Sequence, residues 1–132
     1  MTRKLGQHYR GEGPCGLRAL RQITTANDND IMSACLFHGY DPKVGGMDGY
    51  NWKLAANKLG VKLSTPIFLN GALSLAEVSR HSREEGSTLV VGLATHVLVI
   101  RAGKILDEAN SPPDRRVYIV IPVLNDPYAE AA

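Results

Sequence analysis

Small and apolar residues in the first two thirds of the chain recur at the spacing of helix faces. The clearest case follows Cys15, where four residues fall at i, i+3, i+4 and i+7, the period of one buried helix face. Those four residues are Gly16, Ala19, Leu20 and Ile23. A helix is therefore predicted to begin at Cys15 and to fade by Thr24 and Thr25, because β-branched side chains disfavour helix.

Three further helices are predicted from capping residues and stop signals. Asp30, Asp48 and Ser74 can each cap a helix, and Ser74 with Glu77 has the spacing of a capping box. Glycines shortly after each apolar run mark the helix ends. The predicted helices run from Ile31 to about His38, from the residues after Asp48 to Leu59, and from the residues after Ser74 to Glu85.

From residue 88 onward the pattern changes to short runs of β-branched and apolar residues, which are typical of strands. The predicted strands span residues 88–94, 95–102, 104–109 and 116–123. Before them, residues 61–69 are predicted to be extended, with a break at Pro66 and a turn at Asn70–Gly71. Helices followed by strands predict an α+β domain with an antiparallel sheet of about four strands.

Composition and charge narrow the class of protein. The chain has 132 residues, a net charge of +2, 44% hydrophobic residues and 21% charged residues, which is typical of one globular domain. We expect that domain over residues 1–123 and a loosely held tail over 124–132. No dense basic run indicates nucleic-acid binding. No apolar run approaches the ~20 residues of a membrane span, and no signal peptide is apparent, so we expect a cytoplasmic protein.

The candidate chemistry begins with Cys15, one of two cysteines in the chain. Its predicted place in the first turn of a helix favours the thiolate, because unpaired N–H groups and the helix dipole stabilise negative charge there. Cys35 shares helical spacing with Ile31 and is predicted to be a core residue. Cys35 and His38 have the spacing of half a metal site, but no second pair lies near them, so no metal or cofactor is expected.

A thiolate nucleophile needs a base, and histidine is the usual one. Among four histidines, His96 is favoured because it is predicted to open a rigid apolar strand. Asp107 lies on the strand after the turn at Gly103, so a hairpin would bring its carboxylate close enough to hold the His96 tautomer. Asn110 is the weaker alternative for that role, since an amide can also fill it.

Hydrogen-bond donors are also required, to stabilise the oxyanion that forms when a carbonyl is attacked. The backbone N–H of Cys15 at the helix start is one predicted donor. Gln7, eight residues earlier, is the favoured side-chain donor, and His8 ranks behind it.

The order of Gln, Cys helix, His strand and Asp strand resembles that of papain-like cysteine peptidases. It is most similar to their compact bacterial and phage members, including the bacteriocin-processing C39-like peptidases. The matching stretches are Pro14–Leu17 with Ala19–Leu20, and Thr95–Ile100 followed by Gly103–Asp107. Two features depart from those peptidases: their glutamine usually lies about six residues before the cysteine, and Asp or a small residue often stands where this chain has Pro14.

The resemblance implies a cofactor-free thiol hydrolase whose nucleophile helix packs on the C-terminal antiparallel sheet. Cys15 would attack a peptide or isopeptide bond of a protein or peptide substrate, His96 would protonate the leaving amine, and Asp107 would orient His96. Gln7 would help to stabilise the oxyanion. Two alternatives stay open: a catalytically silent protein of the same fold that grips a host protein, and an amidase or acyltransferase on that fold.

Overall fold

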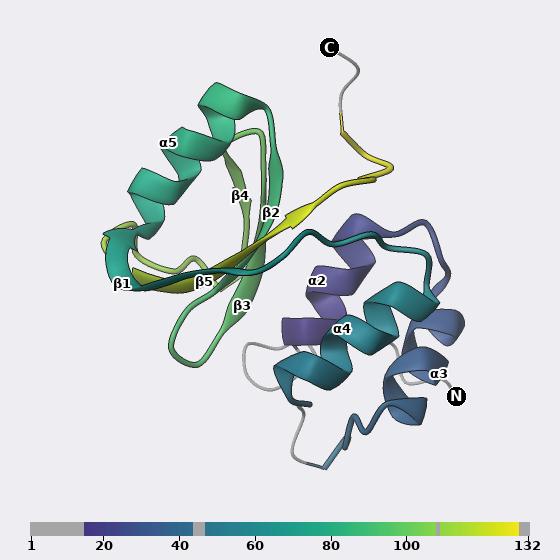
Figure 1. Cartoon of the computed structure of the whole chain (residues 1–132). Coiled ribbons are helices and arrows are strands. Elements are labelled where there is room, and N and C mark those ends of the chain that lie inside the picture. The colour runs from purple at the N-terminus through teal and green to yellow at the C-terminus, as the bar shows by residue number, and fades with distance from the viewer. Residues whose placement is uncertain (1–14, 44–46, 108, 130–132) are drawn as a thin grey trace. The chain divides into compact units, whose positions relative to one another are not determined.

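The computed structural model describes residues 15–43, 47–107 and 109–129 (Figure 1). Four helices and five strands lie within these ranges, so the chain is of the α+β class. Two compact units divide it, residues 1–62 and residues 63–132, and every described strand belongs to the second unit. The single domain expected over 1–123 stays a prediction. Within the described ranges, no helix is long and apolar enough to cross a membrane.

Three helices make up the described part of the first unit. They are α2 (Cys15–Ile23), α3 (Asp28–Phe37) and α4 (Gly49–Lys58). α2 begins at Cys15 as predicted, and the apolar face that includes Leu20 and Ile23 is buried. α4 also begins where predicted, because the side chain of Asp48 accepts a hydrogen bond from the N–H of Asn51 at 2.8 Å.

α3 begins earlier than the sequence predicted. Its N-cap is Asn27 and not Asp30, since Oδ1 of Asn27 accepts a hydrogen bond from the N–H of Asp30 at 2.8 Å. Asp28 and Asp30 then lie in the first helical turn, where carboxylates interact favourably with the helix dipole. The prediction placed the cap wrongly because all four residues of 27–30 are good capping types.

Trp52 ties α4 to the first turn of α2. Its indole Nε1 donates a hydrogen bond to the carbonyl oxygen of Gly16 at 2.8 Å, and its side chain is buried. A Cβ at Gly16 would lie 3.1 Å from Cδ1 of Trp52, so glycine allows the ring to approach the backbone closely. The helical turn that carries Cys15 is therefore fixed by a side chain from another helix.

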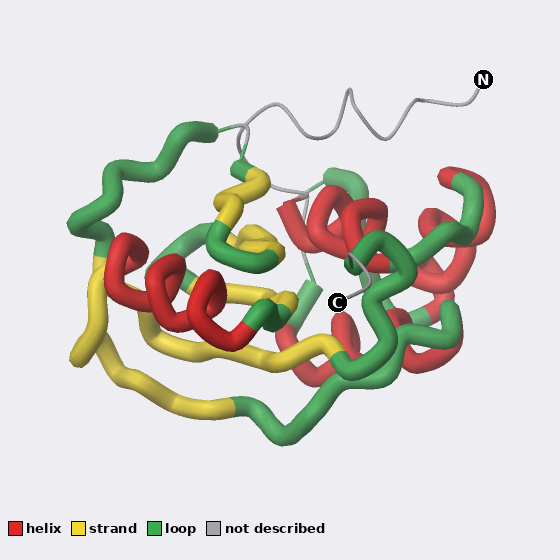
Figure 2. Tube along the Cα trace, turned by 90° about the horizontal axis from the view of Figure 1, so that it is seen from above, coloured by secondary structure: helices red, strands yellow, loops and turns green. Residues whose placement is uncertain are grey.

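The second unit contains a five-stranded antiparallel sheet with the order β1-β5-β2-β3-β4. Its strands are β1 (Ile67–Ser74), β2 (Thr88–Gly92), β3 (Val97–Arg101), β4 (Lys104–Leu106) and β5 (Arg116–Val123). The remaining helix, α5 (Leu75–Glu85), begins at the predicted capping box of Ser74 and Glu77. Figures 1 and 2 show α5 lying against one face of this sheet.

β1 overlaps the stretch 61–69 that was predicted to be extended, but it continues to Ser74. Asn70 and Gly71, expected to form a turn, lie inside β1 with positive φ angles of 51° and 83°. The pairing of β1 with β5 shifts register between Phe68 and Leu73, so the strand pairing is irregular there. Asn and Gly adopt the left-handed region readily, so an irregularity inside a strand and a turn between elements share the same sequence signature.

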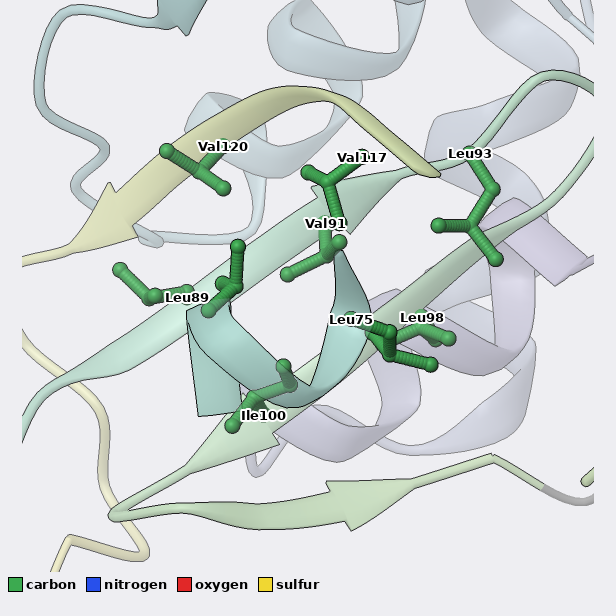
Figure 3. Close-up of a cluster of buried hydrophobic side chains, with 9 residues drawn as sticks. Leu75, Leu89, Val91, Leu93, Leu98, Ile100, Val117 and Val120 are labelled. Atoms are coloured by element: carbon green, nitrogen blue, oxygen red, sulfur yellow. The ribbon is translucent and has the colours of Figure 1, made fainter. Parts of the chain in front are cut away.

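An apolar core lies between α5 and the sheet (Figure 3). Leu75 and Val78 come from α5, and the strands contribute side chains from the facing side of the sheet. The strand residues are Leu89, Val91, Leu98, Ile100, Val117 and Val120, with Leu93 just beyond β2. Alternate residues of β2 and of β3 face this core, as expected for strands with one face against a helix.

Asp126 is anchored to the sheet, although it lies in the segment 124–132 that was expected to be a loosely held tail. Oδ2 of Asp126 accepts hydrogen bonds from Oγ1 of Thr88 and Nε of Arg101, each at 2.6 Å. Burial alone would raise the pKa of Asp126, but the hydrogen bonds from Arg101 and Thr88 outweigh it and hold the pKa below its usual range. Residues 130–132 lie outside the described residues.

Candidate active site

The structure brings His96 and Asp107 together in the second unit. Nε2 of His96 and Oδ1 of Asp107 are 2.8 Å apart, which confirms the predicted pairing. The side chains come from the ends of strands and not from within them, because His96 lies one residue before β3 and Asp107 directly follows β4.

A tight turn between β2 and β3 places His96. The N–H of Leu93 donates a hydrogen bond to the carbonyl oxygen of His96 at 2.7 Å, and the strands pair from Gly92 opposite Val97 onward. The predicted strands 88–94 and 95–102 were too long, because the small and polar residues 94–95 form this turn. His96 therefore lies at the turn of the β2–β3 hairpin. Its carbonyl is hydrogen-bonded to Leu93, and the next residue, Val97, is paired with β2.

A second turn, between β3 and β4, brings Asp107 to His96. Two side chains of α5 form hydrogen bonds with this turn at Gly103. Oγ of Ser79 donates to the Gly103 carbonyl at 2.6 Å, and the Gly103 N–H donates to Oγ of Ser82 at 3.0 Å. Both serines are buried. The packing of α5 therefore fixes the strand pairing that sets Asp107 beside His96.

Burial and hydrogen bonding set the charge state of the pair. The side chains of His96 and Asp107 are only 10% and 2% exposed. Burial alone would raise the pKa of Asp107, but hydrogen bonds from Ser111 and His96 outweigh it and hold the pKa below its usual range. Asp107 is therefore a carboxylate at neutral pH and can only accept hydrogen bonds.

That charge state decides the tautomer of His96. Since Asp107 can only accept, Nε2 of His96 carries the hydrogen of their shared bond. In the neutral ring, Nδ1 is then the basic nitrogen. This arrangement is the one that a general base requires, with one ring nitrogen held by a carboxylate and the other able to take a proton.

Cys15 is the first residue of α2 and is partly buried. No acidic residue lies in the first turn of this helix, so no carboxylate there opposes a thiolate. Arg18 lies three residues further on, on the same side of the helix, and is buried. Arg18 was not among the predicted site residues; a cation at this spacing would favour the thiolate, and the spacing is visible in the sequence.

Cys35 differs sharply from Cys15. It is completely buried in α3, and burial raises the pKa of its thiol to about 12. The prediction that Cys35 is a core residue is confirmed. Both cysteines are free thiols, so Cys15 is the one whose position favours a nucleophile.

The remaining predicted residues fall into two groups. Gln7 and its alternative His8 lie outside the described residues. Asn110, the alternative to Asp107, has a positive φ of 52° and donates its N–H to the Asp107 carbonyl at 3.1 Å, while the hydrogen bond to His96 is made by Asp107.

The three residues proposed for catalysis are divided between the two units of the chain. Cys15 belongs to the first unit, whereas His96 and Asp107 belong to the second. The approach of the Cys15 sulfur to the His96 ring therefore stays a prediction. Over the described ranges, no group of three or more His, Cys, Asp or Glu side chains is arranged to hold a metal ion.

Comparison with known proteins does not add to this description. No family model, curated protein or solved structure matches the chain.

Proposed function

We propose that this protein is a thiol hydrolase of the papain-like type, which cleaves a peptide or isopeptide bond. One observation carries the proposal: His96 and a buried, ionised Asp107 share a 2.8 Å hydrogen bond. Burying a carboxylate is unfavourable unless it is paired and hydrogen-bonded. Hydrolases use such a carboxylate to orient a histidine base, and Cys15 at the start of α2 supplies a nucleophile suited to that base.

The proposed reaction begins with a proton transfer from the Cys15 thiol to Nδ1 of His96. The resulting thiolate attacks the carbonyl carbon, and the carbonyl π electrons move onto oxygen. When the tetrahedral intermediate collapses, the C–N bond breaks and the leaving amine takes the proton from His96. Water then gives a proton to His96 and attacks the thioester, and His96 returns that proton to sulfur as the carboxylic acid leaves.

The start of α2 supplies the other element of the proposal. Cys15 is the first residue of α2, and backbone N–H groups at a helix start point toward the side on which negative charge is stabilised, so its N–H is the proposed donor to the developing oxyanion. Trp52 holds this turn through the Gly16 carbonyl, which favours a donor with a fixed direction. Gln7 stays the proposed second donor, and a protein or peptide in the cytoplasm stays the proposed substrate.

The two cysteines provide a matched test of the nucleophile. Wild type, Cys15→Ala and Cys35→Ala are compared on libraries of fluorogenic peptides and isopeptides, with circular dichroism to confirm folding. We expect Cys15→Ala to lose turnover and Cys35→Ala to keep it. Turnover by Cys15→Ala at the wild-type rate would disprove the assignment. A wild type without turnover and with an unreactive Cys15 would instead point to the silent binding protein.

A further inference from the structure

Both oxygens of the Asp107 carboxylate are held by donors from the segment that follows it. Oδ1 accepts the N–H of Ala109 at 3.1 Å in addition to Nε2 of His96. Oδ2 accepts the N–H of Ser111 at 2.8 Å. The side chain and the backbone N–H of Ser111 both lower the pKa of Asp107, so Ser111 favours the charged form of this carboxylate through two of its groups.

We infer that Ser111 is a positioning residue, which fixes the rotation of the Asp107 carboxylate so that Oδ1 faces Nε2 of His96. The catalytic meaning of this inference rests on the proposed function. The orienting role of Ser111 does not depend on the proposed function, because it concerns only how the Asp107 and His96 side chains are oriented within one unit. Ser111 acts through Asp107 and needs no contact with substrate.

The backbone that carries Ser111 is well fixed. Pro112 and Pro113 follow it, and each has a locked φ angle. The Pro112 carbonyl accepts the N–H of Arg115 at 3.0 Å, and the Pro113 carbonyl accepts the N–H of Ala76 at 2.9 Å. Because Ala76 lies in the first turn of α5, this loop satisfies a helix N–H that has no partner within the helix. Ser111 therefore approaches Asp107 from a rigid support.

The hydroxyl is the part of this support that depends on the residue being serine, since any substitution other than proline keeps the N–H. The Asp107 side chain is only 2% exposed, so water has little room to replace a lost donor. Hydrogen bonds to a buried charged group are stronger than those between neutral groups, and losing one is correspondingly costly. Without the hydroxyl, the carboxylate is freer to rotate away from Nε2 of His96.

A rotated carboxylate would alter the proton position on His96. The Nε2–H tautomer is favoured because Asp107 accepts that hydrogen. When this bond weakens, the Nδ1–H tautomer gains population, and its Nδ1 can no longer accept a proton. Ser111 should thus influence the chemical state of a ring that it does not itself need to touch.

The experiment compares wild type with Ser111→Ala, Ser111→Thr and the control Ser33→Ala, which alters an exposed serine of α3. Nitrogen-15 NMR of the His96 ring reports the tautomer, and steady-state kinetics report kcat and KM separately. For Ser111→Ala we expect a gain of the Nδ1–H tautomer and a fall in kcat of about tenfold, with KM changed less than twofold. Threonine retains the hydroxyl and should restore both, while Ser33→Ala should match wild type.

Two results would overturn the inference. One is a His96 ring spectrum in folded Ser111→Ala that is identical to that of wild type. The other is a loss of activity that threonine does not rescue, which would indicate a general structural role. If Ser111→Ala fails to fold, Ser111→Cys, with a similar volume and a weak donor, replaces it in both measurements.

The same data separate this inference from the proposed function. If wild type hydrolyses no peptide but the His96 ring still responds to Ser111→Ala, the proposed function fails and the positioning role stands. If Cys15-dependent turnover is present but unaffected by Ser111→Ala, and the ring spectrum is also unchanged, the positioning role fails and the proposed function stands.

Discussion

Nε2 of His96 lies 2.8 Å from Oδ1 of Asp107, across eleven positions of sequence. Two tight turns and the packing of α5 on the Gly103 turn create this approach. The carboxylate is buried and hydrogen-bonded on both oxygens. The relationship is therefore built into the second unit.

Replacing Asp107 by asparagine should sharply reduce turnover while keeping the fold. The carboxylate accepts donors on both oxygens, but an amide has only one acceptor oxygen. If that oxygen stays with Ser111, the NH₂ group faces His96 and favours the wrong tautomer. We expect kcat to fall by about 100-fold or more, measured against Asp114→Asn, which alters an exposed carboxylate of the same loop. Equal rates for the two variants would contradict a role for Asp107.

The same carboxylate should make the free energy of unfolding depend on pH in the acidic range. Because the folded-state pKa of Asp107 is lowered, its contribution is fully present above its unfolded pKa of about 4 and is lost as pH falls through the folded pKa. The free energy of unfolding should therefore decrease below about pH 4, and less steeply in Asp107→Asn. Asp126, whose pKa is also lowered, contributes in the same window. Urea unfolding at several pH values gives the slopes, and an identical slope for the variant would exclude Asp107 as a source.

The pair formed by Arg101 and Asp126 should be far more important for stability than the exposed pair of Arg21 and Asp28. The Asp126 side chain is 2% exposed, whereas those of Arg21 and Asp28 are 49% and 41% exposed. Removing one partner of a buried pair leaves the other uncompensated. We expect Asp126→Ala to lower the free energy of unfolding by about 3 kcal/mol and Asp28→Ala by less than about 1 kcal/mol. Comparable losses in urea titrations would refute the anchoring of Asp126.

Gly103 should be less replaceable than Gly60, although both have positive φ angles, 84° and 86°. A Cβ at Gly103 would lie 2.6 Å from Cβ of Arg83, whereas one at Gly60 would meet nothing within 4 Å. Gly60→Ala should cost about 1 kcal/mol from backbone strain alone. Gly103→Ala adds a steric conflict and should cost about 2 kcal/mol or more. If thermal unfolding shows equal losses, the close packing of α5 on this turn is wrong.

Local signals in the sequence predicted much of this architecture. The helix at Cys15, the cap at Asp48 and the capping box at Ser74 could all be predicted, because each depends on residues that lie close together in the sequence. The pairing of His96 with Asp107 was also accessible, since a short hairpin connects them. These features need no knowledge of distant contacts.

Features that depend on long-range partners were missed. The strand character of β1 comes from its pairing with β5, far along the chain, and its Asn70–Gly71 segment looks like a turn in isolation. The anchoring of Asp126 requires Thr88 and Arg101 on other strands. Ser111 was overlooked for a different reason, because its hydroxyl matters only once the loop folds back onto Asp107.

The central proposal is that the Cys15 thiol gives its proton to the His96 imidazole. Its most direct test is the rate at which iodoacetamide alkylates Cys15 at pH 6, located by mass, in wild type and in His96→Ala. We expect rapid labelling of Cys15 in wild type, no labelling of buried Cys35, and a rate at least about tenfold slower without the imidazole. Identical rates of Cys15 labelling in the two folded proteins would contradict the account.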